Sequence, residues 1–329
     1  MTKEQIREKF EEYKEEKKEI LASNDKLKYI ELKKTIRPLL RSILFAQRKI
    51  NGQTIEFINK DFEPTDRKIV FVLSHIGKWD FEIVNEQIKN HFHVIASDFM
   101  NMYGNINGIF MNCNGVVFVD IDDPEDRKNS EKMMMKILEQ DNMMILPEGT
   151  WNLSENEIIR DTHLGAVSIA LEKNAIIVPI SVEQYDKRFV INVGKNFDPQ
   201  TISHKIFNGN YQDLDDQNEK DKLLKLKIKI ETNKELRDRL ATLKYEIWEK
   251  EPITKREDIP YDYWTEFIND RRKEWPGYSM DEQIRNGCFP PAKKQYNNML
   301  EEISKMKINK KNEFLFIDKD EFLKKYGRM

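Results

Sequence analysis

The sequence predicts an α/β fold, namely a mixed, mostly parallel sheet flanked by helices, with helical additions at both ends. Three observations lead to this prediction. Short apolar, β-branched segments alternate with helix-like segments through the middle of the chain. Residues 1 to about 50 contain no glycine, are dense in Glu and Lys, and carry apolar residues at helical spacing. Beyond about residue 200 the chain becomes highly charged again.

Six segments have the composition of buried strands, and helix-like segments lie between them. The predicted strands are 68–74, 91–97, 115–121, 142–148, 175–182 and 188–194. The predicted intervening helices are 78–90, 100–111, 124–140 and 161–173. A short turn joins the last two strands, which is compatible with a hairpin.

The change in character along the chain predicts three parts. Residues 1–52 form an N-terminal helical segment that ends at the Asn-Gly pair, and residues 53–200 form the α/β domain. Residues 201–329 form a helical, charged C-terminal region, whose role cannot be inferred from its composition. Whether this region folds alone or packs on the α/β domain is equally open.

Charge and cysteine content narrow the class of protein. The chain has 55 Lys and Arg against 58 Asp and Glu, whereas a nucleic-acid binder is usually clearly basic. Cys113 and Cys288 have no CxxC spacing and are expected to be free thiols in a reducing compartment. The charged N-terminus does not resemble a signal peptide, and no apolar run approaches the roughly 18–20 residues of a membrane span. We expect a cytoplasmic protein, either free or peripheral on the inner face of the cell membrane, with no nucleic-acid partner.

A histidine and an aspartate stand close together after the first predicted strand. In the stretch VLSHIGKWDFE, His75 follows the apolar run and Asp80 comes five residues later, with a helix expected to begin near Gly77. Across such a turn the carboxylate can fold back to the imidazole, fix its tautomer and leave the other ring nitrogen as a base. Taken alone, the pair is equally compatible with a surface histidine beside a helix-capping aspartate.

Three further stretches coincide with later predicted strands. They are GVVFVD (Gly115–Asp120), ILPEGTWN (Ile145–Asn152) and IIVPISV (Ile176–Val182). The second brings the polar residues Glu148 and Thr150, with Gly149 between them, to the end of a strand. In an α/β sheet this end lies at the same level as His75, where binding sites form. By itself Pro-Glu-Gly-Thr could also be an ordinary tight turn.

Together these blocks resemble the glycerolipid acyltransferase family, which includes the lysophosphatidate and glycerol-3-phosphate acyltransferases. The matching pattern is His, four residues, Asp; then Gly-x-x-Phe; then Pro-Glu-Gly-Thr; then Val-Pro-Ile. The resemblance covers about residues 65–200. Each block alone is weak, but four blocks in this order on an α/β pattern are specific.

The resemblance implies a reaction and the residues that perform it. His75 would be the general base that activates an acceptor hydroxyl, and Asp80 would hold and polarise it. The hydroxyl of a lipid acceptor would attack the thioester of acyl-CoA or acyl-carrier protein, with no metal and no cofactor. Backbone N–H groups would stabilise the oxyanion. The implied substrate-binding residues are Gly115, Phe118, Glu148, Gly149, Thr150, Trp151 and Pro179.

The chain departs from the family pattern at two positions. Ile121 and Trp151 stand where phosphate-handling members usually carry an arginine. Neither side chain can offer the bidentate fork that Arg gives to phosphate. Neighbouring cations could replace these arginines, and the candidates are Arg127, Lys128 and Arg160. Otherwise the acceptor is a non-phosphorylated one such as a glycolipid, or the chain is a catalytically silent lipid-binding protein.

The remaining candidates have plainer interpretations beside the functional ones. His91 and His93 share one face of a strand but have no third metal ligand at a recognisable spacing. His163 follows the third block and could lie near the acceptor. The methionines 133–135, 143 and 144 are expected in the core, although flexible Met also suits an acyl groove.

Two helical stretches could act as surfaces. Residues 36–50 mix Arg and Lys with large apolar residues and fit either a membrane surface or a helix packed on the body. The charged stretch 219–250 fits either an amphipathic helix with one solvated face or a coiled-coil arm.

Overall fold

The computed structural model describes residues 25–60, 62–77, 79–97, 106–120, 123–149, 151–152 and 158–251, and isolated residues before position 20. Statements below concern this part of the chain. The interpretations of Thr150, Ile121, Cys288 and everything from residue 252 onward lie outside it.

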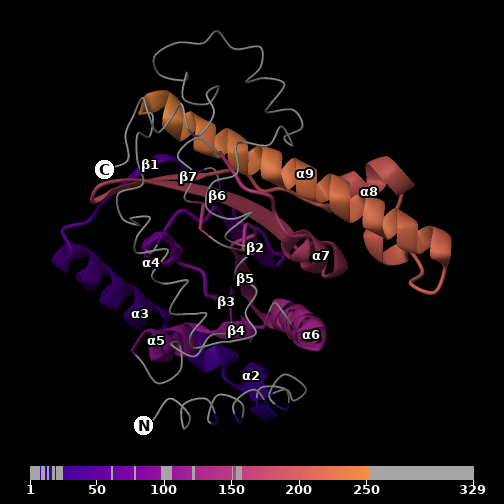
Figure 1. The fold of residues 1–329 in the computed structure, drawn as a ribbon, viewed down its shortest axis with the longest axis horizontal. Coiled ribbons are helices and arrows are strands. Elements are labelled where there is room, and N and C mark those ends of the chain that lie inside the picture. The colour runs from indigo at the N-terminus through magenta and orange to yellow at the C-terminus, as the bar shows by residue number, and fades with distance from the viewer. Residues whose placement is uncertain are drawn as a thin grey trace.

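A seven-stranded sheet with the order β1-β7-β6-β2-β5-β3-β4 forms the centre of the molecule (Figure 1). Its strands are β1 (Thr54–Lys60), β2 (Ile69–Leu73), β3 (Phe92–Ser97), β4 (Val116–Val119), β5 (Asn142–Ile145), β6 (Ile176–Tyr185) and β7 (Arg188–Val193). The pairs β2–β5, β2–β6, β3–β5 and β3–β4 are parallel, and so is β1–β7. Strands β6 and β7 form the antiparallel hairpin. The predicted mixed, mostly parallel sheet is confirmed.

Strand β1 was missed in the sequence because it lies at the edge of the sheet. It pairs only with β7, starting from Thr54 opposite Arg188, and none of its side chains is fully buried. An edge strand with one wet face alternates apolar and polar residues instead of forming the continuous apolar run of the central strands. The alternation of Ile55 and Phe57 with polar neighbours was the available signal.

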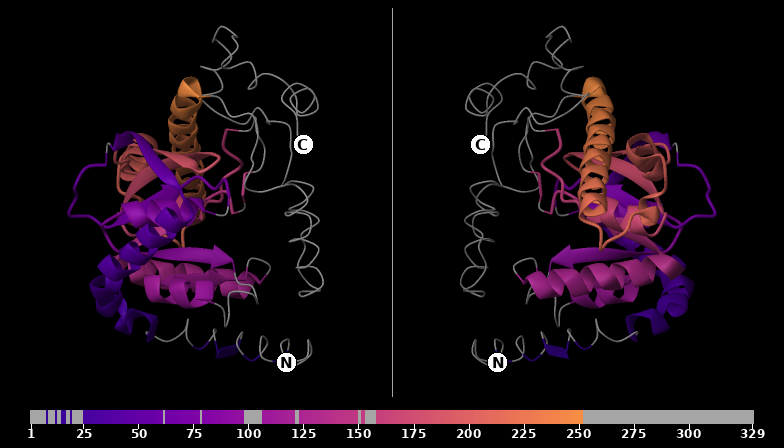
Figure 2. Two further views of the ribbon diagram at one scale, coloured as in Figure 1. Left: turned by 90° about the vertical axis from the view of Figure 1, so that its left-hand side faces the viewer. Right: turned by 90° about the vertical axis from the view of Figure 1, so that its right-hand side faces the viewer.

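Helices cover both faces of the sheet (Figures 1 and 2). They are α2 (Asp25–Lys28), α3 (Ile30–Ile50), α4 (Asp80–Gln87), α5 (Ile106–Asn114), α6 (Pro124–Gln140), α7 (Gly165–Glu172), α8 (Gln200–Phe207) and α9 (Glu219–Lys250), with a short 3₁₀ turn at Tyr211–Asp213. Val70 and Val72 of β2 face a core shared with α6, α7 and α9. Phe71 and Leu73 face the opposite core, which α4 completes. The strand therefore reads as one continuous apolar run because both of its faces are buried.

The first part of the C-terminal region packs on the α/β body. Helix α9 contacts β6, β7 and α7, and its residues Leu240 and Trp248 are buried in the main core. The Asn218 side chain caps its first turn by accepting from the N–H groups of Lys220 and Asp221. One side of α9 is therefore part of the core, as in an amphipathic helix. None of the described helices has the length and apolar character needed to cross a membrane.

Candidate active site

The turn between β2 and α4 places His75 at the carboxyl ends of the parallel strands. Strand β2 ends at Leu73, and α4 begins at Asp80. Strand β5 runs parallel beside β2 and ends at Ile145, so the Pro147–Asn152 stretch emerges at the same edge. Two of the predicted blocks therefore meet here, which is the usual position for a site in an α/β sheet.

Asp80 folds back onto His75 across this turn. Its Oδ2 atom lies 2.9 Å from His75 Nδ1 and also accepts the N–H groups of Ile76 at 2.6 Å and Gly77 at 3.0 Å. The carboxyl group of Asp80 is buried, whereas the His75 side chain is 21% exposed. With Asp80 ionised, Nδ1 holds the ring proton and Nε2 keeps its lone pair. Within the described residues no hydrogen bond occupies Nε2.

The carboxylate of Glu148 points into the protein and not toward an open acceptor site. Only 3% of the residue is exposed. Its Oε1 atom accepts the backbone N–H of His75 at 2.8 Å, and its Oε2 atom accepts that of Arg160 at 3.0 Å. Burial raises the pKa of Glu148, although these two hydrogen bonds act in the opposite direction. Glu148 was predicted to bind the acceptor, but both of its carboxylate oxygens already accept hydrogen bonds from backbone N–H groups.

The other residues of this block surround His75. The backbone N–H of Asn152 donates to the His75 carbonyl at 2.6 Å. The Trp151 ring lies edge-on to the His75 ring, with 6.0 Å between their centroids. Gly149 has a φ of 68°, and a Cβ there would lie 2.8 Å from Nε2 of His163. The structure therefore brings His163 beside the third block, as the sequence allowed.

Three other predicted substrate residues lie in the strands of the sheet or directly beside them. Gly115 directly precedes β4, at the amino end of that strand, with a φ of 100° and the ring of His93 against its α-carbon. Phe118 is buried in a small cluster with Val94. Pro179 lies within β6 opposite Val72, in a fully buried part of the strand. The position of Gly115 at the amino end of β4 favours a structural role, because motif spacing does not distinguish the two ends of a short strand, whereas the roles of Phe118 and Pro179 stay predictions.

The cations suggested as substitutes for the missing arginines lie in two different places. Arg127 and Lys128 are exposed in the first turns of α6, beyond β4 at the edge of the sheet. Arg160 is buried, and its backbone N–H is bound to Glu148. Through this bond Arg160 is tied to the His75 region.

A second histidine cluster lies at the amino ends of β3 and β5, on the side of the sheet opposite to His75. His91 Nδ1 and His93 Nδ1 lie 2.6 and 2.8 Å from the same oxygen of Asp141, and all three residues are buried. Asp141 comes from a distant part of the chain and completes a group of three potential metal ligands, which no recognisable spacing in the sequence indicated. Asp141 is about 50 residues away from the two histidines in sequence, so no local pattern indicated the contact.

This trio fits a metal ion poorly despite its composition. The nitrogens that would bind a metal are the ones that contact Asp141, and both Nε2 atoms are buried without a hydrogen-bond partner among the described residues. Metal-bound histidines normally donate their other N–H to an acceptor. Lys33 and Arg37 also interact electrostatically with Asp141, which disfavours a further cation. We assign the trio a structural role.

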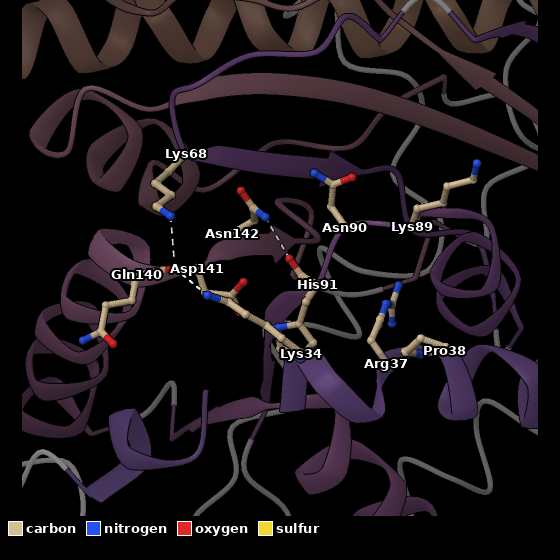
Figure 3. Close-up of a pocket in the computed structure, with 10 residues that line it drawn as sticks. All are labelled: Lys34, Arg37, Pro38, Lys68, Lys89, Asn90, His91, Gln140, Asp141 and Asn142. Atoms are coloured by element: carbon tan, nitrogen blue, oxygen red, sulfur yellow. Dashed lines mark hydrogen bonds and ion pairs between the residues drawn. The ribbon is translucent and has the colours of Figure 1, made fainter. Parts of the chain in front are cut away.

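A cavity of about 390 Å³ lies beside this second cluster and is lined by several cations (Figure 3). Lys34 and Lys68 both point toward the carbonyl of Gln140 and donate to it at 3.1 and 3.0 Å. Arg37 donates to the Ile88 carbonyl at the end of α4. These cations satisfy helix C-termini, whose carbonyls favour positive charge.

Comparison with known proteins supports the sequence motifs. Residues 54–183 match the family model described as Acyltransferase. The match agrees with the resemblance predicted from the motifs and covers the segment that contains His75, Asp80 and Glu148. No curated protein matches the chain.

Among solved structures, the chain is similar to the 1-acyl-sn-glycerophosphate (LPA) acyltransferase PlsC from Thermotoga maritima. The similarity has a TM-score of 0.43 with 12% sequence identity, and it covers 61% of this chain and 79% of that one.

Proposed function

We propose that this protein transfers a fatty acyl group from an acyl thioester to the hydroxyl of a lipid acceptor, with His75 as general base. The observation that supports this most is the contact of 2.9 Å between His75 Nδ1 and a buried Asp80 oxygen, inside an acyltransferase domain. The contact leaves Nε2 of a partly exposed ring to meet the substrate.

In the proposed reaction, Nε2 of His75 removes the proton of the acceptor hydroxyl as its oxygen attacks the thioester carbonyl. Asp80 stabilises the imidazolium that forms. The tetrahedral intermediate then collapses, the carbon–sulfur bond breaks, and the thiolate leaves with the proton carried by His75. One ester forms and one thiol is released, without a covalent acyl-enzyme.

The oxyanion of that intermediate needs hydrogen-bond donors. The N–H groups of Ile76 and Gly77, although close to His75, already donate to Asp80. The proposed oxyanion donors are therefore other backbone N–H groups near the turn. Neither a metal nor a bound cofactor enters the proposed reaction, and the acyl donor is acyl-CoA or acyl-carrier protein.

A non-phosphorylated acceptor is the second candidate, and the position of Trp151 favours it. Its ring lies beside His75, where phosphate-handling relatives of the family usually carry an arginine. An aromatic edge can pack on a sugar or an acyl chain but cannot neutralise a phosphate. A lysophospholipid acceptor would require a cation from elsewhere, such as Arg160.

We also propose that the protein works at a membrane surface, on the cytoplasmic side of the cell membrane. Helix α3 and its N-cap expose large apolar side chains, namely Tyr29, Leu32, Leu39, Ile43, Phe45 and Ile50. Lys49 lies in the last turn with its ammonium group over the Phe45 ring, whereas the neighbouring Arg48 is paired with Glu86. Exposed apolar residues beside such a cation fit the interface of a bilayer that contains anionic lipids.

The proposal is tested by thiol release from acyl-CoA and acyl-carrier protein against lysophospholipids, glycerol phosphate and glycolipids. The wild type is expected to turn over with at least one pair, and His75→Ala is expected to lose that turnover while remaining folded. Retained turnover in His75→Ala would overturn the assignment of the base. A wild type that binds lipid but is silent with every donor and acceptor would support the lipid-binding alternative.

A further inference from the structure

We infer that Glu148 is a positioning residue, which fixes the backbone of the catalytic histidine and does not bind the acceptor. This inference deepens the proposed function and rests on His75 being the base. It concerns the part of the site where the sequence alone suggested a polar handle for the substrate.

The backbone of His75 is held from both sides by the segment that follows β5. Its N–H donates to Glu148 Oε1 at 2.8 Å, and its carbonyl accepts from the Asn152 N–H at 2.6 Å. With Asp80 on the side chain, His75 is anchored at its amide, its carbonyl and its ring. The direction in which Nε2 points therefore depends on where Glu148 sits.

Glu148 also couples His75 to a third segment. Its other oxygen accepts the N–H of Arg160, just before the turn in which the His163 N–H donates to the Pro147 carbonyl at 2.8 Å. One buried carboxylate thus joins the ends of β2 and β5 to the segment that leads into α7. Two backbone donors on one carboxylate favour its ionised form.

The positive charge of a buried lysine, Lys244, also favours the ionised form of Glu148. Lys244 of α9 is completely buried, donates to the Val182 carbonyl, and interacts electrostatically with Glu148. Lys244 also lies 3.4 Å from Glu183. Through Lys244, which is paired with Glu183, the C-terminal helix therefore contributes to the electrostatics around Glu148, and this gives one role to a region that sequence analysis left open.

An acceptor-binding role is difficult to reconcile with this geometry. Each Glu148 oxygen already accepts a backbone N–H, and the side chain has almost no exposed surface. A substrate hydroxyl would have to displace one of these buried donors and leave it unpaired, which is costly. A displacement of His75 by about 1 Å is enough to cost on the order of 10²-fold in rate.

The test compares Glu148→Gln with Asp141→Asn. Both wild-type carboxylates are buried, both accept two N–H groups, and they flank opposite ends of β5. A glutamine oxygen can accept, but its NH₂ group cannot, so one of the two backbone bonds is lost. We expect Glu148→Gln to lower kcat by about 10²-fold with the acceptor KM changed less than about threefold. Asp141→Asn should leave both constants near wild-type values.

A second readout does not depend on turnover. Hydrogen exchange at the His75 amide is expected to accelerate by about tenfold or more in folded Glu148→Gln, because its acceptor is weakened or lost. It should stay unchanged in Asp141→Asn. Glu148→Asp, which keeps the charge but is one methylene shorter, should give an intermediate kcat.

Three outcomes are distinguishable. A rise in acceptor KM with unchanged kcat would show that Glu148 contacts the acceptor and overturn the inference. Unchanged exchange at the His75 amide in Glu148→Gln would overturn it as well. A wild type without turnover would remove the proposed function, and the exchange measurement would still decide whether Glu148 holds the His75 backbone.

Discussion

Two histidine–carboxylate clusters lie at opposite ends of the parallel strands of one sheet, and they differ in what surrounds them. At the carboxyl ends of the strands, Asp80 holds the Nδ1 of His75, whose side chain is 21% exposed. At the amino ends, Asp141 holds the Nδ1 atoms of His91 and His93, whose side chains are 4% and 0% exposed. The hydrogen-bonding chemistry is nearly the same, but only the first cluster offers a ring nitrogen to a substrate.

The surroundings explain why the same chemistry supports different roles. Around Asp80 the extra donors are backbone N–H groups of the turn itself, so the carboxylate is held by local structure. Around Asp141 the neighbours are side chains from α3, including Lys33 and Arg37, which interact with it through charge. The first arrangement orients a partly exposed imidazole, whereas the second ties β3 and β5 to a helix.

The largest expected effect is that of Asp80→Asn. All three contacts of Asp80 fall on one oxygen, whose place an amide oxygen can take, but the amide is neutral and no longer stabilises the imidazolium that forms on His75. Turnover should fall by about 10³–10⁴-fold. Thiol release under saturating donor measures this loss, with circular dichroism as the control for folding. Wild-type turnover in Asp80→Asn would show that the His75–Asp80 pair is not needed for the reaction.

Asp141→Asn should have the opposite profile. It replaces the charged oxygen that two buried imidazoles share by a neutral amide oxygen, so we expect a loss of roughly 3 kcal/mol in the free energy of unfolding. Turnover of the folded fraction should be close to that of the wild type. Urea unfolding measures the first quantity and thiol release the second. A folded variant that has lost turnover would show that the second cluster serves catalysis.

Trp151→Arg sharpens the question of the acceptor. An arginine beside His75 restores the charge that the family pattern places there and can grip a phosphate bidentately. The kcat/KM for phosphorylated acceptors relative to a glycolipid is expected to rise by about tenfold, which corresponds to about 1.4 kcal/mol. Trp151→Gln provides a control without charge. An unchanged ratio in Trp151→Arg would mean that this position does not face the acceptor head group.

The smallest expected effect is on the pH dependence of stability. Burial lowers the pKa of His93 despite its hydrogen bond to Asp141. A group whose folded pKa is below its unfolded value of about 6.5 binds protons preferentially in the unfolded state. Its stabilising contribution is therefore complete above about pH 6.5 and declines as the pH falls toward the folded pKa.

For Asp141, burial acts to raise the pKa, but the hydrogen bonds from both histidines outweigh it and hold that pKa below its ordinary value. Its contribution is lost only below about pH 4. Unfolding free energies measured from pH 7.5 to 5 should fall more steeply in the wild type than in His93→Gln. Equal slopes would show that His93 does not titrate differently in the folded protein.

Local features of the site were predictable from the sequence, and distant ones were not. His75 and Asp80 are five residues apart across a strand-to-helix turn, so their contact follows from local geometry. Asp141 reaches His91 and His93 only because β5 pairs with β3 in the folded sheet. The inward orientation of Glu148 depends on the Arg160 segment. Lys244 comes near Glu148 only because α9 packs against β6 in the folded protein.

The fold shows the same division. The central strands were visible because burial on both faces makes them continuous apolar runs, whereas the half-exposed β1 was not. Gly115 was placed with the substrate because its block resembles a family motif. Its strand is short, and the structure puts the glycine at the amino end, against His93.

The most direct test of the central claim is the turnover of His75→Gln and His91→Gln measured side by side with the same donor and acceptor. Each variant replaces an imidazole bound to a buried carboxylate by a neutral side chain that is not a base at neutral pH. We predict that His75→Gln loses at least about 10²-fold in kcat while His91→Gln retains wild-type turnover in its folded fraction. Retained turnover in His75→Gln would contradict the assignment of the base.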